Sequence, residues 1–216
     1  MTPLTLALSK KPMRVWRVPP ESSWLKPASF LQPTARANSP PAALTDQPPG
    51  KRIHMVSLGG AVEASPHMPS LDYDGFLRTT LSMTRDMRDV EQAFRRMIFN
   101  LRAHNRDVHV RQHAYLIDGK GECHLSPAFD LTFSPGPGVE YYMAIECEGR
   151  DITHADVVSS GVRHGISRKR IGTIVDEVRA AVADWVNCAS LCGVTVSLTG
   201  IKSRLAATDQ IFVAGR

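Results

Sequence analysis

The residue types best suited to chemistry lie close together in one stretch, Arg106-Asp107-Val108-His109-Val110-Arg111-Gln112. Loops that catalyse phosphoryl transfer carry an aspartate that accepts the proton of the attacking hydroxyl and, five residues later, an amide that reaches a magnesium ion. Asp107 and Gln112 have this spacing, and a second carboxylate, Asp130, can supply a further oxygen ligand for the metal. An aspartate in a loop is more often a helix cap or a solvated charge. The spacing of Asp107 and Gln112 therefore indicates phosphoryl transfer only if the surrounding elements match those of a kinase.

A β-hairpin is predicted between the two carboxylates. Residues 115–117 and 122–125 are strand-like, and Asp118-Gly119-Lys120-Gly121 between them is a turn signal. The order of a helix, an aspartate loop, a hairpin and a metal-binding aspartate is that of the C-terminal lobe of a kinase. We therefore expect Asp107 and Asp130 to converge across the hairpin on one pocket for a metal-bound triphosphate.

Helices are predicted on both sides of this unit. Residues 72–83 and 154–164 have helical patterns, as does the segment that follows a possible cap at Ser167. The clearest helix begins after Asp86, and its apolar residues recur at steps of three and four: Val90, Phe94, Met97, Ile98 and Leu101. A short β segment is expected near residue 55. The sequence thus predicts an α+β fold that is mostly α-helical, with one small hairpin.

The chain has 216 residues, of which 43% are hydrophobic and 22% charged, as expected for a soluble globular protein with a hydrophobic core. No apolar run reaches the roughly 20 residues required to cross a bilayer. The N-terminus makes a poor signal peptide because its lysines follow the apolar stretch. We therefore expect a cytoplasmic protein without membrane contact. The net charge of +5 permits contact with nucleic acid or phosphate-rich ligands, although a mildly basic surface explains it equally well.

Three regions are distinguished along the chain. Residues 1–49 hold most of the prolines and no helical or strand period, so they are predicted to form a disordered leader. Residues 50–206 carry the elements described above and form the expected folded domain. Residues 207–216 are assigned to a tail, and Gly193 and Gly200 punctuate the chain before it.

Possible ligands for a transition metal are present, but their spacing is not diagnostic. His104, His109 and His113 lie in the loop region around the predicted catalytic aspartate. The chain has four cysteines, Cys123, Cys147, Cys188 and Cys192, and disulfides are not expected in a cytoplasmic protein. Cys188 and Cys192 have a spacing that puts two thiols on one face of a helix, but no second pair faces them, so they are predicted to be small core residues rather than zinc ligands.

Three stretches together carry a family resemblance: Phe99-Asn100, Asn105 to Gln112, and Leu125-Ser126-Pro127-Ala128-Phe129-Asp130-Leu131. They resemble the C-terminal domain of HipA-family toxins, whose members typically read FN…NxDDHxKN…LxPAYDL. The resemblance extends over residues 50–206. It implies a serine/threonine protein kinase of the toxin type, here represented by its kinase-like C-terminal lobe, with ATP and Mg²⁺ as cofactors.

The resemblance also implies roles for individual residues. Asp107 would be the catalytic proton acceptor, and Gln112 and Asp130 would be the Mg²⁺ ligands. Phe129 would lie beside the nucleotide. The cofactor-binding stretch along the phosphates would consist of four consecutive residues: His109, Val110, Arg111 and Gln112.

Partners follow from the same resemblance. Known members phosphorylate a protein of the translation machinery and are held inactive by a small DNA-binding antitoxin of the HipB type, so contact with DNA would be indirect or weak. Val108 replaces an aspartate of the motif, and Arg111-Gln112 replaces Lys-Asn. Residues 1–90 contain no glycine-rich phosphate loop and no strand lysine that would grip ATP. The isolated chain is therefore expected to be a poor kinase. The alternative functions are an impaired lobe that binds an antitoxin or DNA, and a remnant without function.

Overall fold

The computed structural model describes residues 53–64, 71–136, 138, 140–185 and 199–213. Most of the ordered elements expected from the sequence fall in these ranges. The predicted leader, residues 1–49, lies outside them, as do Cys188 and Cys192.

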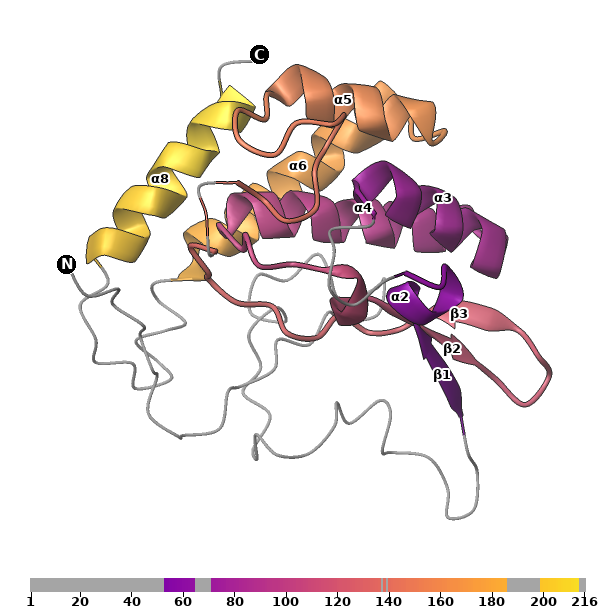
Figure 1. Ribbon diagram of the computed structural model, residues 1–216. Coiled ribbons are helices and arrows are strands. Elements are labelled where there is room, and N and C mark those ends of the chain that lie inside the picture. The colour runs from indigo at the N-terminus through magenta and orange to yellow at the C-terminus, as the bar shows by residue number, and fades with distance from the viewer. Residues whose placement is uncertain (1–52, 65–70, 137, 139, 186–198, 214–216) are drawn as a thin grey trace, which may run out of the picture.

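Helices form most of the described molecule, and a small sheet lies to one side of them (Figure 1). In Figure 1, α4 runs through the middle, with α3 beside it, α5 and α6 above it, and α8 at the end away from the sheet. The bounds of the main helices are α3 Tyr73–Thr84, α4 Met87–Arg102, α5 His154–Arg163, α6 Arg168–Ala183 and α8 Thr199–Val213. The predicted mostly helical α+β fold is confirmed.

The helix α4 forms the centre of the hydrophobic core. Its N-cap is Asp86, whose Oδ1 atom accepts a 2.8 Å hydrogen bond from the backbone N–H of Arg88. The apolar residues that predicted this helix are all buried, with exposed fractions of 0–1%: Val90, Phe94, Met97, Ile98 and Leu101. The preceding helix α3 begins in the same way, because Asp72 accepts a hydrogen bond from the N–H of Gly75.

Three antiparallel strands form the sheet, in the order β1-β2-β3. Their bounds are β1 His54–Ser57, β2 Ala114–Ile117 and β3 Cys123–Leu125. Tyr115 is the central register position, since it pairs with Val56 on one side and with Leu125 on the other. The predicted hairpin and the β segment near residue 55 are both confirmed, and they belong to one sheet.

Two short helices flank the sheet. The helix α2, Leu58–Ala61, continues directly from β1, and the 3-10 helix η3, Val110–Gln112, precedes β2. The sequence predicted only a loop at 104–112, because three residues are too few to show a period. Val110 is buried and packs against Gly59 of α2, where an added Cβ atom would lie 3.0 Å from its Cγ2 atom.

The helix α8 was not predicted from the sequence. It is held to α4 by Arg102, whose Nη1 atom donates a 2.6 Å hydrogen bond to the carbonyl oxygen of Leu205. Asp209 forms ion pairs with Arg102 at 2.9 Å and with Arg179 at 2.8 Å, and Phe212 is 1% exposed. No helix in the described ranges is both long and apolar enough to span a bilayer.

Candidate functional site

The end of α4 determines where the loop that carries Asp107 begins. His104 has a left-handed backbone, with φ at 55°, and its N–H donates to the carbonyl of Leu101. The N–H of Asn105 donates to the carbonyl of Asn100 at 2.8 Å, which completes a Schellman motif. The His104 ring stacks on Phe133 at 5.5 Å. Burial lowers its pKa to about 4, and it is therefore neutral near pH 7.

A buried chain of polar side chains ties this loop to the rest of the site. The amide nitrogen of Asn100 donates to the hydroxyl of Tyr73 at 3.0 Å. The amide nitrogen of Asn105 donates to Oδ1 of Asn100 at 3.2 Å, and the hydroxyl of Thr132 donates to Oδ1 of Asn105. Asn100 and Asn105 are 1% and 2% exposed. The two asparagines of the family motif therefore position the loop without reaching solvent.

Backbone hydrogen bonds fasten the same loop to the segment that follows Asp130. The N–H of Arg106 donates to the carbonyl of Ser134, and the N–H of Ser134 donates to the carbonyl of His104. Gly136 has a φ of 69°, and an added Cβ atom there would lie 2.9 Å from Cβ of Arg106. Glycine is therefore required at this close approach between the two segments.

Asp107 lies at the exposed tip of the loop. On one side of it, the guanidinium of Arg106 lies 5.2 Å from the centre of the Tyr141 ring. On the other side, Val108 is only 4% exposed and lines a pocket. The apolar residue at this motif position is thus explained by burial, because an unpaired carboxylate there would be desolvated.

The two predicted metal ligands are in contact. Nε2 of Gln112 donates a hydrogen bond to Oδ2 of Asp130, while Oε1 of Gln112 accepts one from the N–H of His109 at 2.9 Å. Asp130 is exposed and has a φ of 54°, in the left-handed region that few residues other than glycine adopt. Backbone conformations of this kind concentrate at functional sites.

A pocket opens beside this contact. Three predicted site residues line it, namely Gln112, Phe129 and Asp130. The remaining lining residues come from α4, the loop after it, the position between η3 and β2, and the segment after β3: Arg96, Asn100, Asn105, Val108, His113, Ala128 and Leu131.

The other predicted site residues are placed differently. Asp107 and Arg111 are exposed and lie outside the pocket lining. His109 meets the ring of Tyr142 edge-on at 6.1 Å. Val110 belongs to the core, as described above, so only its backbone is available to a ligand.

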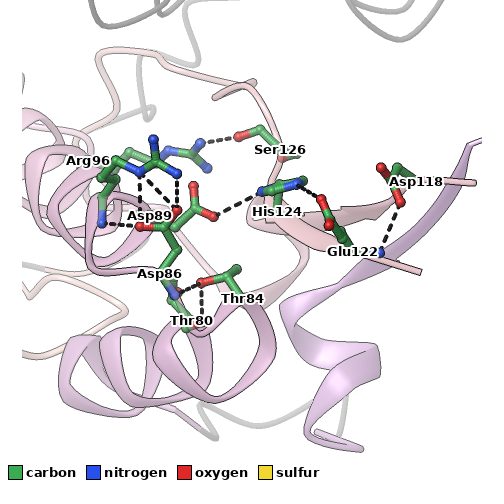
Figure 2. A network of polar contacts seen from close by, with 10 residues as sticks. Thr80, Thr84, Asp86, Asp89, Arg96, Asp118, Glu122, His124 and Ser126 are labelled. Atoms are coloured by element: carbon green, nitrogen blue, oxygen red, sulfur yellow. Dashed lines mark hydrogen bonds and ion pairs between the residues drawn. The ribbon is translucent and has the colours of Figure 1, made fainter. Parts of the chain in front are cut away.

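Two buried polar residues of the pocket were not predicted to belong to it: the sequence analysis did not single out Arg96, and it considered His113 only as a possible transition-metal ligand. Arg96 of α4 is 6% exposed and reaches the carbonyl oxygen of Ser126, beside Asp89 and His124 (Figure 2). Burial lowers its pKa to about 10, and the charge of Asp89 acts against that shift. His113 is 2% exposed, and its ring stacks on Phe76 at 4.0 Å. Burial, followed by the charge of Arg96, holds the pKa of His113 well below its usual value.

The possible transition-metal ligands do not gather. His104 and His113 stack on different aromatic rings, and the described residues contain no group of three or more His, Cys, Asp or Glu side chains that could hold a metal. Cys123 is half-buried and Cys147 is exposed, and both are free thiols. The pair predicted to be core residues, Cys188 and Cys192, lies outside the described residues.

Comparisons with known proteins bear on the family and the fold of this chain. A family model described as the HipA-like C-terminal domain matches residues 38–186. A search of curated proteins finds no match. Among solved structures, the chain is similar to a chain in the Shewanella oneidensis MR-1 toxin–antitoxin complex of HipA, HipB and operator DNA, at 17% identity and a TM-score of 0.57. The match covers 78% of this chain and 45% of that one, so the present chain spans less than half of its relative.

Proposed function

The chain belongs to the HipA-like C-terminal domain family, and from this membership we propose that it carries the catalytic-loop half of a serine/threonine kinase. Its reaction is the transfer of a phosphoryl group from ATP–Mg²⁺ to a protein hydroxyl. The observation that supports the proposal best is the hydrogen bond between Gln112 and Asp130 at the rim of the pocket. It joins two residues that the family motif assigns to the same metal.

The proposed roles of Asp107, Asp130 and Phe129 follow from their exposure and position. Asp107 is exposed at the loop tip, where a hydroxyl of a protein substrate can approach it and give up its proton. Asp130 offers a hard carboxylate oxygen, which suits Mg²⁺, and its Oδ2 atom already accepts from Gln112. If bound here, Mg²⁺ would be held by Asp130 and Gln112 and would supply positive charge that neutralises the phosphates. Phe129 lines the same pocket and provides an apolar surface for the nucleotide.

Gln112 fits the metal less well than Asp130 does. Its carbonyl oxygen caps η3 by accepting from His109, and its amide nitrogen faces Asp130. A turn of the amide toward a metal breaks both hydrogen bonds, each of which contributes about 1 kcal/mol. We therefore expect weak Mg²⁺ binding. None of the three described strands carries a lysine that could hold the phosphates, which adds to the expectation of slow turnover.

Growth inhibition on expression of the whole chain, together with phosphate transfer by the purified protein, tests the proposal. The substitution Asp107→Ala removes the proton acceptor at an exposed position and should abolish both, without lowering the thermal midpoint. Asp151→Ala, at another exposed loop position, is the matched control and should retain both. Equal toxicity of the Asp107→Ala variant and the unmodified chain would contradict the kinase function.

A second candidate function is binding without catalysis. The solved relative is described in a complex with HipB and operator DNA, and this chain has a net charge of +5. A lobe with weak metal binding can still contact a small DNA-binding antitoxin of that type, and through it DNA. A stable complex with such an antitoxin in size-exclusion chromatography, formed by a chain that shows no phosphate transfer, would favour this function.

If the chain instead acts as a kinase, we propose that its protein substrate belongs to the translation machinery.

A further inference from the structure

A buried cation lines the pocket without a complete set of partners. The guanidinium of Arg96 donates through Nη2 to the carbonyl of Ser126, but its Nε and Nη1 atoms have no hydrogen-bond partner among the described residues. The charge of Asp89 favours the charged form of Arg96, but within the described ranges no ion pair joins a carboxylate to its guanidinium. A desolvated cation in this condition is costly unless an anion accompanies it.

A second buried group in the same pocket is also incomplete. Both ring nitrogens of His113 lack a hydrogen-bond partner in the part of the chain that the structure describes. Stacking on Phe76 at 4.0 Å and edge contact with Tyr73 at 6.5 Å fix the plane of the ring. Neither contact uses the nitrogen atoms. A neutral imidazole has one N–H donor, so His113 can donate a hydrogen bond to the same acceptor as Arg96.

We propose that the inner end of this pocket is an anion site, in which Arg96 and His113 donate hydrogen bonds to one oxygen atom of a phosphate group. Among the other lining residues, Asn100 and Asn105 are already paired with each other, and Val108 and Leu131 are buried apolar side chains. Arginine presents a fork of donors that matches phosphate geometry.

The position of the anion site relates it to the phosphotransfer centre. Gln112 and Asp130 line the same pocket and are less buried than Arg96 and His113, and Asp130 repels an anion as long as no cation shields it. Phosphate and Mg²⁺ should therefore each strengthen the binding of the other. The inference depends on the proposed function only for the identity of the anion as a nucleotide phosphate. Because none of the three described strands carries a lysine, Arg96 would supply part of the positive charge that a strand lysine provides in other kinases.

A purely structural role for Arg96 is the competing explanation. Its contact with Ser126 fastens α4 to the segment after β3, and loss of that contact lowers stability in any case. The stacking of His113 on Phe76 is likewise a packing contact. A test must therefore measure anion affinity separately from stability, and it must include a change that leaves the Ser126 contact in place.

The experiment is a titration of the full chain with inorganic phosphate, without metal or nucleotide, followed by calorimetry at pH 7. The unmodified chain should bind phosphate saturably. Arg96→Met should weaken binding about tenfold or more, since hydrogen bonds to a charged group are lost. His113→Phe keeps the stacked ring and the Ser126 contact but removes the donor, and it should weaken binding several-fold. Arg96→Lys should weaken phosphate binding less than Arg96→Met does and more than His113→Phe does. Asp130→Asn should bind metal-free phosphate as well as the unmodified chain or better.

Each outcome decides the proposal. Unchanged phosphate affinity in His113→Phe and Arg96→Lys, or no binding by the unmodified chain, overturns it. These two variants decide the matter even where Arg96→Met fails to fold. Repetition with ATP, with and without Mg²⁺, separates the two proposals. If phosphate binding depends on Arg96 but the chain transfers no phosphate, the result supports the anion site and counts against the proposed kinase function. If Arg96→Lys and His113→Phe leave both phosphate transfer and phosphate affinity unchanged, the result supports the kinase function and overturns the anion site.

Discussion

The amide nitrogen of Gln112 donates a hydrogen bond to Oδ2 of Asp130, so the residues just before and just after the β2–β3 hairpin meet. The hairpin register sets this meeting, because Tyr115 lies opposite Leu125 and both are buried. A slip of one residue would turn these side chains to the other face of the sheet. The short hairpin thus works as a spacer that brings a loop amide and a carboxylate to one pocket.

The proposed contribution of Asp130 to metal binding can be measured directly. Asp130→Asn removes the negative charge and keeps a residue that tolerates the left-handed backbone at this position. The Mg²⁺-dependent part of ATP affinity should fall about tenfold, while the free energy of unfolding stays close to that of the unmodified chain because the side chain is exposed. Calorimetric titration with ATP at varied Mg²⁺ measures the first quantity. A variant that retains full Mg²⁺ dependence would show that Asp130 is not a ligand.

The buried asparagine chain should contribute to stability as well as to loop position. Asn105→Ala leaves Oδ1 of Asn100 without its donor inside the protein, so the free energy of unfolding should fall by about 1–3 kcal/mol. Urea denaturation measures this change. Thr132→Val is the control, because it removes only the 3.4 Å bond at the end of the chain and should cost less than Asn105→Ala. Equal costs for both variants would argue against a connected network.

Two helical glycines give a matched pair. An added Cβ atom at Gly161 of α5 would lie 2.6 Å from Cδ1 of Ile171 and 3.0 Å from Cε2 of Phe94. Gly161→Ala should therefore destabilise the protein by about 1–3 kcal/mol through overpacking. Gly172 of α6 has nothing within 4 Å of such an atom, so Gly172→Ala should stabilise by about 0.5–1 kcal/mol through helix propensity alone. Thermal midpoints that move in the same direction would refute the close α5–α6 packing.

The acid stability of the α8 contact depends on Asp209. Its hydrogen bonds with Arg179 are the largest cause that lowers the pKa of this carboxyl in the folded protein. A carboxyl with a lowered pKa stabilises the fold above its unfolded pKa of about 3.9 and loses that contribution as the pH falls through the folded value. The stability difference between the unmodified chain and Asp209→Asn should therefore shrink from neutral pH to about pH 3. Denaturation curves at both pH values measure it; a difference independent of pH would contradict this ion pairing.

The helices and strands near the site were readable from sequence because each has a strong local signal. The caps Asp72 and Asp86 begin α3 and α4, and Asp118 begins the hairpin turn by accepting from two backbone N–H groups. The helix α8 was missed because Gly200 near its start reads as a breaker and only three of its residues are buried: Leu205, Thr208 and Phe212. Their spacing of three and four is helical, so a signal was present, but it was weak.

The site was only partly predictable for a different reason. Gln112 and Asp130 were found through a motif, and the structure brings them into contact. Arg96 and His113 belong to no such motif, and their interest comes from burial between segments that are distant in sequence. Arg96 and Asn100, four residues apart on a buried helix, were the available sign, because charged and amide groups rarely enter a core without a partner.

The hydrogen bond from Arg102 to Leu205 connects residues that are 103 positions apart in the chain. During synthesis α4 emerges before α8, so Arg102 can form this hydrogen bond only after nearly all of the described chain has been translated. Completion of the core is therefore a late event on the ribosome. A nascent chain that stalls before residue 205 leaves the guanidinium at the C-terminal end of α4 without this acceptor, so the contact between α4 and α8 cannot form.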